Sequence, residues 1–204
     1  AHIRSIAGIQ DVPFDPVCCG SDQFAALVGK VFPVLDDEAG LAMQVAIGGA
    51  RAAQDSVGGV VECACVGLPA GVGAPMFDGI ENVVAKLLFG IPAVKGVEFG
   101  AGFAAADMYG SQNNDPIVLD EAGHATCRTN NAGGILGGIS TGMPVIVRAA
   151  FKPTPSIAEE QSTIDIVEGC QTRLVEHDGV VVLRAVHVGG GEARPELDAL
   201  HGGD

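Results

Sequence analysis

Three carboxamide side chains stand side by side in the stretch GSQNNDPI, which spans residues 110–117. Gln112, Asn113 and Asn114 are followed by an Asp-Pro pair that is typical of a turn. Each amide can both donate and accept hydrogen bonds. The simplest interpretation is a polar surface loop, and the alternative is that the amides bind the edge of a flat polar ring.

A stiff segment with one cation, FKPTPSI, follows further along the chain. Pro153 and Pro155 fix their own φ angles and favour an extended backbone at Lys152 and Thr154. The segment would then present the Lys152 ammonium and the hydroxyls of Thr154 and Ser156, which together suit an anion. Spacing alone, however, favours a Pro-rich exit from a strand.

Two glycine-rich stretches could bring backbone amides close to a ligand. NNAGGILGGISTG, residues 130–142, could approach a phosphate or a ring face, or it could be a loop that needs positive φ angles. GAGFAA, residues 100–105, matches the dinucleotide fingerprint, with Asp120 and Glu121 about 20 residues further on. The residues after it are too short and broken for the helix that this fingerprint requires, so a turn is favoured.

Two further sets of side chains could take part in chemistry. His177 and Asp178 could be a general base with its acidic partner, although two polar residues at a strand end are commoner. The six cysteines contain no C-x-x-C pair, and their spacing matches no common zinc site. We therefore expect no metal, and we predict reduced, mostly buried thiols.

The composition limits the classes of partner. The chain has 204 residues, 48% of them hydrophobic, which suffices for a core in one large domain or two small ones. The net charge of −14 argues against nucleic-acid binding, because no basic stripe is available to contact phosphates. A small anionic ligand would have to rely on a few local bases and backbone amides. No apolar run is long enough for a membrane span, and no signal peptide is visible.

A mixture of helices and strands must position these residues. The clearest helix is 77–91, where apolar residues three and four apart form one stripe and Pro92 ends it. Further helices are predicted at 21–31, with Ser21 as the cap, and at 38–54. Because the elements show no regular βαβ alternation, an α+β arrangement of layers is favoured. Strands are predicted at 1–9, 60–68, 93–103, 144–151, 162–169 and 180–186.

Four stretches of the chain together indicate a family, because they occur in this order: GIENVVAKLLFGIPAVKGVEFGAGF, GSQNNDP, NNAGGILGGISTGMPVIVRAAFKPTPSI and EHDGVVVLRAV. Taken together they closely resemble chorismate synthase. The resemblance covers residues 1–188, as the C-terminal portion of that domain, and residues 189–204 are expected to be a polar, disordered tail. It implies a layered βαββα-type sandwich, a homotetramer when full length, and a cytoplasmic location.

The resemblance also implies a reaction, that of a lyase in the shikimate pathway to the aromatic amino acids. Chorismate synthase eliminates phosphate from 5-enolpyruvylshikimate 3-phosphate in an anti-1,4 sense and gives chorismate. It requires reduced FMN, which is not consumed, and NADPH is a candidate reductant. As in cofactor enzymes generally, the protein would bind and orient the flavin.

Single residues can be carried over where this sequence matches the family's motifs. Gln112 and Asn113 match the amide pair that contacts FMN, and Gly137 matches a glycine beside the flavin. Asp178 matches an acid near the flavin that is implicated in proton handling. The segment that holds FMN, chiefly near its phosphate, matches Lys152, Pro153, Thr154, Pro155 and Ser156.

Two departures from the family pattern bear on activity. The family's Arg-His-Asp-Pro-Cys signature reads Glu-His-Asp-Gly-Val from Glu176 onward, which reverses a charge where anions bind. The family's Gly-Glu-Ser-His-Gly and Gly-Arg-Ser-Ser-Ala-Arg segments and its second catalytic histidine do not occur in this sequence. We therefore expect the chain alone to be inactive. The alternatives are a non-catalytic homologue that keeps the fold and oligomer contacts, and a dinucleotide-binding oxidoreductase built on GAGFAA.

Overall fold

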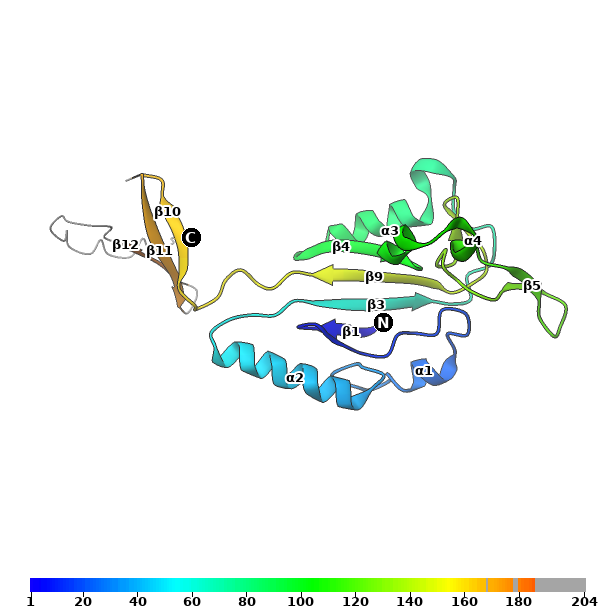
Figure 1. The fold of residues 1–204 in the computed structure, drawn as a ribbon, viewed down its shortest axis with the longest axis horizontal. Coiled ribbons are helices and arrows are strands. Elements are labelled where there is room, and N and C mark those ends of the chain that lie inside the picture. Colours follow the sequence, from blue (N-terminus) through cyan, green and yellow to red (C-terminus); the bar gives the residue numbers. More distant parts are fainter. Residues whose placement is uncertain (168, 178–179, 186–204) are drawn as a thin grey trace. The chain divides into compact units, whose positions relative to one another are not determined.

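The computed structural model describes residues 1–167, 169–177 and 180–185. These residues form both helices and strands (Figure 1). The chain divides into two compact units. The larger comprises Ala1–Gly48 and Val57–Pro153, and the smaller comprises Gly49–Ser56 and Thr154–Asp204. The predicted tail at 189–204 lies outside the described residues. Among those that are described, no helix is both long and apolar enough to cross a membrane.

The larger unit is built on a five-stranded antiparallel sheet in the order β2-β1-β3-β9-β4. The strands predicted at 60–68, 93–103 and 144–151 are confirmed but are shorter. The strand predicted at 1–9 is interrupted, because Ala7 and Gly8 adopt positive φ angles of 52° and 82° and form a turn. The strands are β1 (His2–Ile6), β2 (Ile9–Gln10), β3 (Gly59–Cys65), β9 (Val145–Phe151) and β4 (Val94–Phe99).

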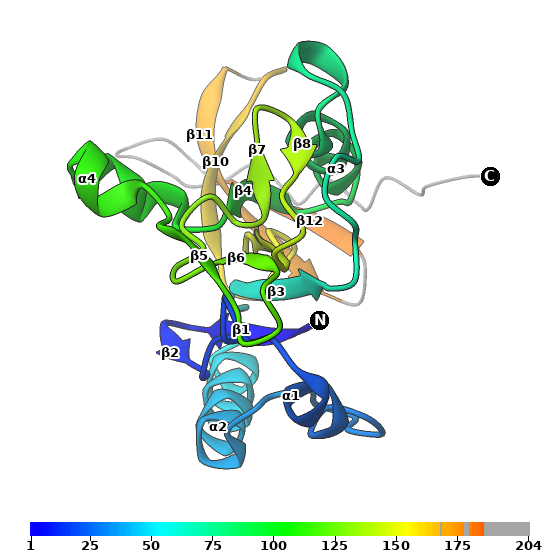
Figure 2. The same cartoon turned by 90° about the vertical axis from the view of Figure 1, so that its right-hand side faces the viewer.

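Helices α2 (Asp37–Ala52) and α3 (Ile80–Phe89) lie at the two ends of this sheet, α2 beyond β1 and α3 beside β4 (Figure 2). The prediction for α2 is confirmed. Helix α3 begins three residues later than predicted, because Met76–Asp78 forms a separate 3-10 turn and Gly79 is extended. The helix predicted at 21–31 is wrong in length: α1 covers only Ser21–Ala25, and its N-cap is Gly20 rather than Ser21.

A buried core cluster of the larger unit forms around Ile146 of β9. Phe14, Cys19 and Ile146 are buried together, and Phe24 stacks edge-on against Phe14 with ring centroids 5.6 Å apart. The six cysteines, all within the described residues, are free thiols. Only Cys19 is buried, however, so the prediction of mostly buried thiols is wrong.

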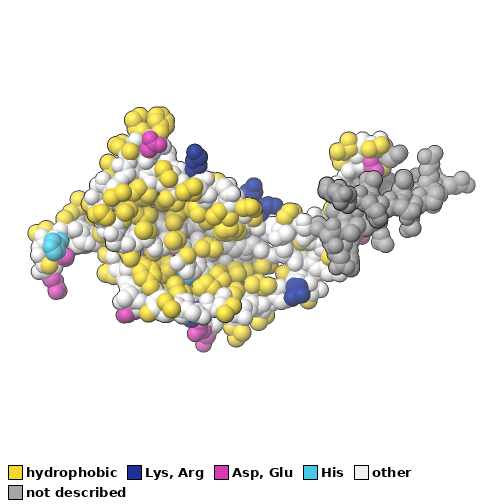
Figure 3. Space-filling view, turned by 180° about the vertical axis from the view of Figure 1, so that it is seen from behind, with side chains coloured by type: hydrophobic (Ala, Val, Ile, Leu, Met, Phe, Trp, Pro, Cys, Tyr) yellow, Lys and Arg dark blue, Asp and Glu magenta, His cyan; other side chains and the backbone are white. Residues whose placement is uncertain are grey.

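The apolar stripe of α3 is only partly covered within the described residues. Ile80, Val84 and Leu88 are half-buried, whereas Val83 and Leu87 are 45% and 68% exposed. Figure 3 shows hydrophobic side chains over much of one face of the larger unit. Periodicity therefore predicted the helix correctly, but the stripe is not a fully buried face here.

The smaller unit contains a three-stranded antiparallel sheet of β10 (Gln161–Asp165), β11 (Cys170–His177) and β12 (Val180–Ala185). The strand predicted at 162–169 ends at Asp165, and the chain then turns through Gly169, whose φ is 64°. Strand β11 was not predicted. The strand predicted at 180–186 is confirmed as β12.

Candidate functional site

The GAGFAA stretch forms a tight turn at the end of β4. Gly100 has a φ of 54°, and a Cβ atom there would lie 2.1 Å from the Asn131 carbonyl oxygen and 2.4 Å from the Gly133 nitrogen. The turn therefore packs directly on the loop at 130–133, and Ala101 N donates to Asn131 O at 2.8 Å. The segment after it, η2 (Gly102–Asp107), is a 3-10 helix. The α-helix required for dinucleotide binding is not formed, which supports the interpretation as a turn.

The amide stretch is a short helix rather than a loop. Helix α4 (Gly110–Asn113) contains Gln112 and Asn113, of which Gln112 is exposed and Asn113 half-buried. Gln112 Oε1 accepts a hydrogen bond from the backbone nitrogen of Tyr109 at 2.8 Å. One acceptor of the amide pair is therefore already used to cap the start of α4.

Asp115 joins this amide helix to the glycine loop. Its Oδ1 accepts hydrogen bonds from Thr129 Oγ1 and Asn131 N, both at 2.7 Å, and its Oδ2 accepts one from Ala132 N at 2.9 Å. Asn131 Nδ2 in turn donates to the carbonyl oxygens of Gln112 and Asn113, each at 3.2 Å. Sequence reasoning missed Asp115 and Asn131, although an aspartate before proline is a known signal for such backbone capture.

The stretch predicted as a glycine loop contains a small hairpin, β7 (Ile135–Leu136) and β8 (Ile139–Ser140). Gly137 and Gly138 form its turn, with φ angles of 60° and 85°, so the prediction of positive φ is confirmed. A Cβ on Gly138 would meet the Ala74 carbonyl oxygen at 2.8 Å. A Cβ on Gly137 would meet no described atom within 4 Å, so there is open space on that side.

The Lys152–Ser156 segment leaves the end of β9 without helical structure, and all five side chains are exposed. Lys152 N donates to Ala93 O at 2.9 Å, which fixes the start of the segment beside β4. The carbonyl oxygen of Thr154 accepts a hydrogen bond from Ser56 Oγ at 2.7 Å. The Lys152 ammonium and the Thr154 and Ser156 hydroxyls are therefore available to an anion in solution.

Within the larger unit, the described site residues fall into two groups at opposite ends of β9. The amide helix is connected through Asn131 to the Gly100 turn, and Gly100 N donates to Ile146 O near the start of β9. Lys152 follows the other end of that strand. In Figure 1, α4 lies by the tail of the β9 arrow, far from its head. About six residues of strand separate the groups, which corresponds to ~20 Å.

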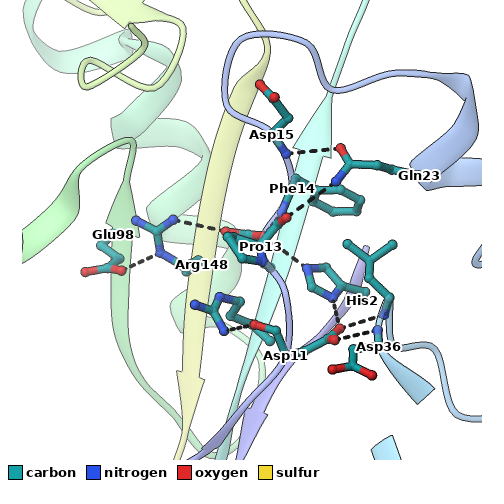
Figure 4. Close-up of polar contacts among 12 residues, drawn as sticks. His2, Asp11, Pro13, Phe14, Asp15, Gln23, Asp36, Glu98 and Arg148 are labelled. Carbon is teal, nitrogen blue, oxygen red and sulfur yellow. Dashed lines mark hydrogen bonds and ion pairs between the residues drawn. The ribbon is translucent and has the colours of Figure 1, made fainter. Parts of the chain in front are cut away.

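Arg148 lies in the middle of β9, and its guanidinium contacts Glu98 (Figure 4). Its guanidinium donates to the Gly100 carbonyl oxygen and to Glu98 Oε1, and Nη1 donates to Glu62 Oε1 at 3.1 Å. Glu98 Oε2 also accepts from Phe103 N at 3.2 Å. Burial acts to lower the pKa of Arg148, but the hydrogen bonds with Glu98 and Glu62 outweigh it and raise that pKa.

The predicted acid, Asp178, lies outside the described residues. Glu176 and His177 are the last residues of β11, and their backbones pair with Val181 and Val180 of β12. In the described part of the chain, no group of three or more histidine, cysteine, aspartate or glutamate residues is placed to hold a metal ion.

Comparisons with known proteins give the family context for these groups. A family model described as chorismate synthase matches residues 1–196. A chorismate synthase from Methanococcoides burtonii is 43% identical over 193 residues, covering 92% of this chain and 51% of the relative. One from Methanosarcina acetivorans is 49% identical over 192 residues, with the same two coverages.

A solved structure entitled "Crystal Structure of Chorismate Synthase" also matches, with a TM-score of 0.67 and 29% sequence identity. The match covers 76% of this chain and 48% of that one. The chain thus spans about half the length of the relatives it matches. The family match extends over the Gly100 turn, the amide helix, the Gly137 hairpin and the segment after β9. The chain belongs to the chorismate synthase family.

Proposed function

We propose that this chain contributes to a chorismate synthase reaction, the elimination of phosphate from 5-enolpyruvylshikimate 3-phosphate to give chorismate. The observation that carries the proposal is the family match over residues 1–196, together with 43% and 49% identity to chorismate synthases over most of the chain. The reaction is that of a carbon–oxygen lyase. It belongs to the shikimate pathway, which leads to the aromatic amino acids.

The chemistry explains which side chains such a site needs. A ring C–H bond and a C–O bond to phosphate break, a new carbon–carbon double bond forms, and the substrate undergoes no net oxidation. A base must accept the ring proton, and the phosphate leaves with the electron pair of the C–O bond. Substrate and FMN are both anionic while this chain carries a net charge of −14, so local cations and hydroxyls must hold them.

Reduced FMN, when bound, supplies transient electron density to the reacting system. The donor set of Lys152, Thr154 and Ser156 is exposed and has the chemistry to hold the FMN phosphate. Pro153 and Pro155 stiffen that segment, so less conformational freedom is lost when it binds. On this proposal Lys152–Ser156 is the phosphate-binding part of the site.

The second part of the proposed site is the amide helix with the Gly137 hairpin. The open space beside Gly137 leaves room for a planar ring. Asn113 would offer its amide to the ring edge, and Gln112 would offer its Nε2 donor, since its Oε1 is bonded to Tyr109. Because these groups lie at the far end of β9 from Lys152, the two parts must be tested separately. Asp178 is proposed to handle the proton.

The remaining details of the proposal follow from the family resemblance. They are a layered βαββα-type sandwich, a homotetramer when full length, NADPH as a candidate reductant of the flavin, and a cytoplasmic location. A second candidate is a non-catalytic homologue. It is favoured by one observation, the glutamate at position 176 where the family has an arginine.

The experiment is anaerobic turnover of 5-enolpyruvylshikimate 3-phosphate with reduced FMN, followed by chorismate absorbance. We expect the 204-residue chain to bind oxidised FMN, measured by fluorescence quenching, without turning over substrate. The reason is that general acid–base groups corresponding to the family's histidine segments are not in this sequence. A full-length protein containing this chain should turn over substrate. Failure of that protein to do so, with FMN binding intact, would favour the non-catalytic homologue.

A further inference from the structure

One of the most buried polar side chains of the larger unit is a histidine that neither part of the proposed site uses. His2 is 1% exposed, on β1, and its ring packs edge-on against Phe14 with ring centroids 4.5 Å apart. Nδ1 lies 2.8 Å from Asp11 Oδ2, and Nε2 lies 3.0 Å from Glu62 Oε2 (Figure 4). Both ring nitrogens therefore face carboxylate oxygens.

The two carboxylates have little reason to carry a proton. Burial acts to raise the pKa of Glu62, but hydrogen bonds from His2, Phe14 N and Arg148 outweigh it and hold that pKa below its ordinary value. Burial also acts to raise the pKa of Asp11. Hydrogen bonds to Asp11 from the backbone nitrogens of Leu35 and Asp36, and from His2, outweigh burial and hold that pKa below its ordinary value.

An ionised carboxylate only accepts hydrogen bonds, so each ring nitrogen must be the donor. We propose that His2 is a doubly protonated imidazolium in the folded chain, and that this buried cation holds the segment of residues 11–36 onto the sheet. A neutral imidazole has one nitrogen that only accepts. It would turn that nitrogen toward an acceptor and break one of the two contacts.

The positions of the two carboxylates explain what the imidazolium holds. Asp11 begins the segment, and its oxygens accept from Leu35 N at 2.7 Å and Asp36 N at 2.8 Å at the segment's other end. Glu62 belongs to the sheet and accepts from Phe14 N at 2.8 Å. His2 therefore bridges the closed ends of the segment to β3, and the Phe14 side chain is placed in the core.

The other charged and titratable groups around the cluster are consistent with a cation at His2. Arg148 on β9 bonds to Oε1 of Glu62 and leaves Oε2 to His2 and Phe14. Cys19 is buried nearby, and its pKa is raised first by burial and then by the charge of Glu62, so it stays a neutral thiol. Without the imidazolium, Glu62 would keep only Arg148 and Phe14 N as donors, and Asp11 would keep the backbone donors of Leu35 and Asp36.

The direct test is nitrogen NMR of the 204-residue chain with ¹⁵N-labelled histidine at pH 7.5. We expect the His2 signal, assigned by its loss in His2→Gln, to show a proton on both ring nitrogens. His124, which is exposed and has a single carboxylate 3.5 Å away, serves as the internal reference. A His2 signal with one unprotonated ring nitrogen overturns the proposal.

Amide substitutions at the two acids test the second half of the proposal, that the cluster holds residues 11–36 onto the sheet. Asn or Gln removes the negative charge and also one acceptor, since both oxygens of Asp11 and of Glu62 accept hydrogen bonds from N–H donors. On the imidazolium proposal, both substitutions and His2→Gln lower the folding equilibrium constant about a hundredfold or more. His124→Gln, the matched control, should change it by about twofold or less. Near-neutral effects of both acid substitutions would contradict the proposal.

Discussion

Arg148 on β9 and Glu62 on β3 are directly opposed in the antiparallel sheet, with Arg148 Nη1 donating to Glu62 Oε1 at 3.1 Å. The side chains are 19% and 1% exposed, so this is a largely desolvated pair. The same guanidinium contacts Glu98 and the Gly100 carbonyl oxygen. One cation therefore neutralises two acids and stabilises the turn on which the amide helix depends.

Replacing Arg148 with methionine should destabilise the chain by about 3–5 kcal/mol, because two acids lose their shared buried partner. Urea unfolding measures the change in the free energy of unfolding. The matched control is Arg173→Met, whose pair with Glu160 is more exposed, and it should cost less than about 1 kcal/mol. Equal costs for the two variants would mean that Arg148 contributes no more than an exposed ion pair.

Stability should fall in acid because of Asp11 and Glu62. Both have a pKa held below the ordinary value in the folded chain, so the unfolded chain binds more protons between the two values. Their contribution is present above about pH 4, the ordinary range of aspartate and glutamate, and is lost as the pH falls through the lower folded values. Acid unfolding followed by circular dichroism should show a shallower pH dependence in Asp11→Asn. An unchanged slope would contradict this prediction.

Alanine substitutions at Gly100 and Gly137 distinguish the cost of backbone strain from the cost of a steric clash. Both have positive φ angles, so an alanine costs about 1–2 kcal/mol at either position. Only at Gly100 would the new Cβ also overlap the loop at 130–133. We therefore expect Gly100→Ala to lower the free energy of unfolding clearly more than Gly137→Ala does. If Gly137→Ala instead abolishes FMN binding while the chain stays folded, the open side of that hairpin belongs to the cofactor site.

Separate variants test the two parts of the proposed flavin site in a full-length protein containing this chain. Asn113→Ala should weaken FMN binding by about 1–3 kcal/mol if its amide meets the ring edge, with the exposed Asn114→Ala as control. Fluorescence quenching measures the affinity. Unchanged affinity in Asn113→Ala would mean that α4 is not part of the cofactor site.

The corresponding test at the other end of β9 is Lys152→Ala, which removes the proposed partner of the FMN phosphate. We expect a loss of affinity of about tenfold that shrinks at high salt. Lys95→Ala, an exposed lysine on β4, controls for the general effect of losing a positive charge. Equal losses of FMN affinity in the two variants would contradict the proposal that Lys152 binds the FMN phosphate.

Glu176→Arg tests the charge reversal relative to the family. If Glu176 lies where the family has its arginine, it repels an anionic cofactor. At roughly 5 Å and an effective dielectric constant near 20, each charge pair contributes about 3 kcal/mol before screening. We expect Glu176→Arg to bind FMN at least about tenfold more tightly at low salt. Equal affinities at low and high salt would place Glu176 away from the site, and the assignment of Asp178 would fall with it.

The sequence by itself determined the family and most of the longer local elements. The apolar repeat predicted α3, the valine-rich run predicted β9, and the order of four motifs identified the resemblance that the comparisons confirm. These signals depend on neighbours a few residues apart or on matches along the chain. The three amides were likewise recognised as polar, but the hydrogen bond by which Gln112 caps α4 was missed although it is local.

Only the tertiary structure decided which polar residues are buried and what they contact. His2 carried no signal in its own neighbourhood, yet it bonds to Glu62, 60 residues away, and Glu62 bonds to Arg148, 86 residues further on. Sheet register sets these contacts by aligning β1, β3 and β9 side by side, and register cannot be read from local spacing. The amide helix and Lys152 lie at opposite ends of β9, because the extended strand between them keeps the residues at its two ends apart.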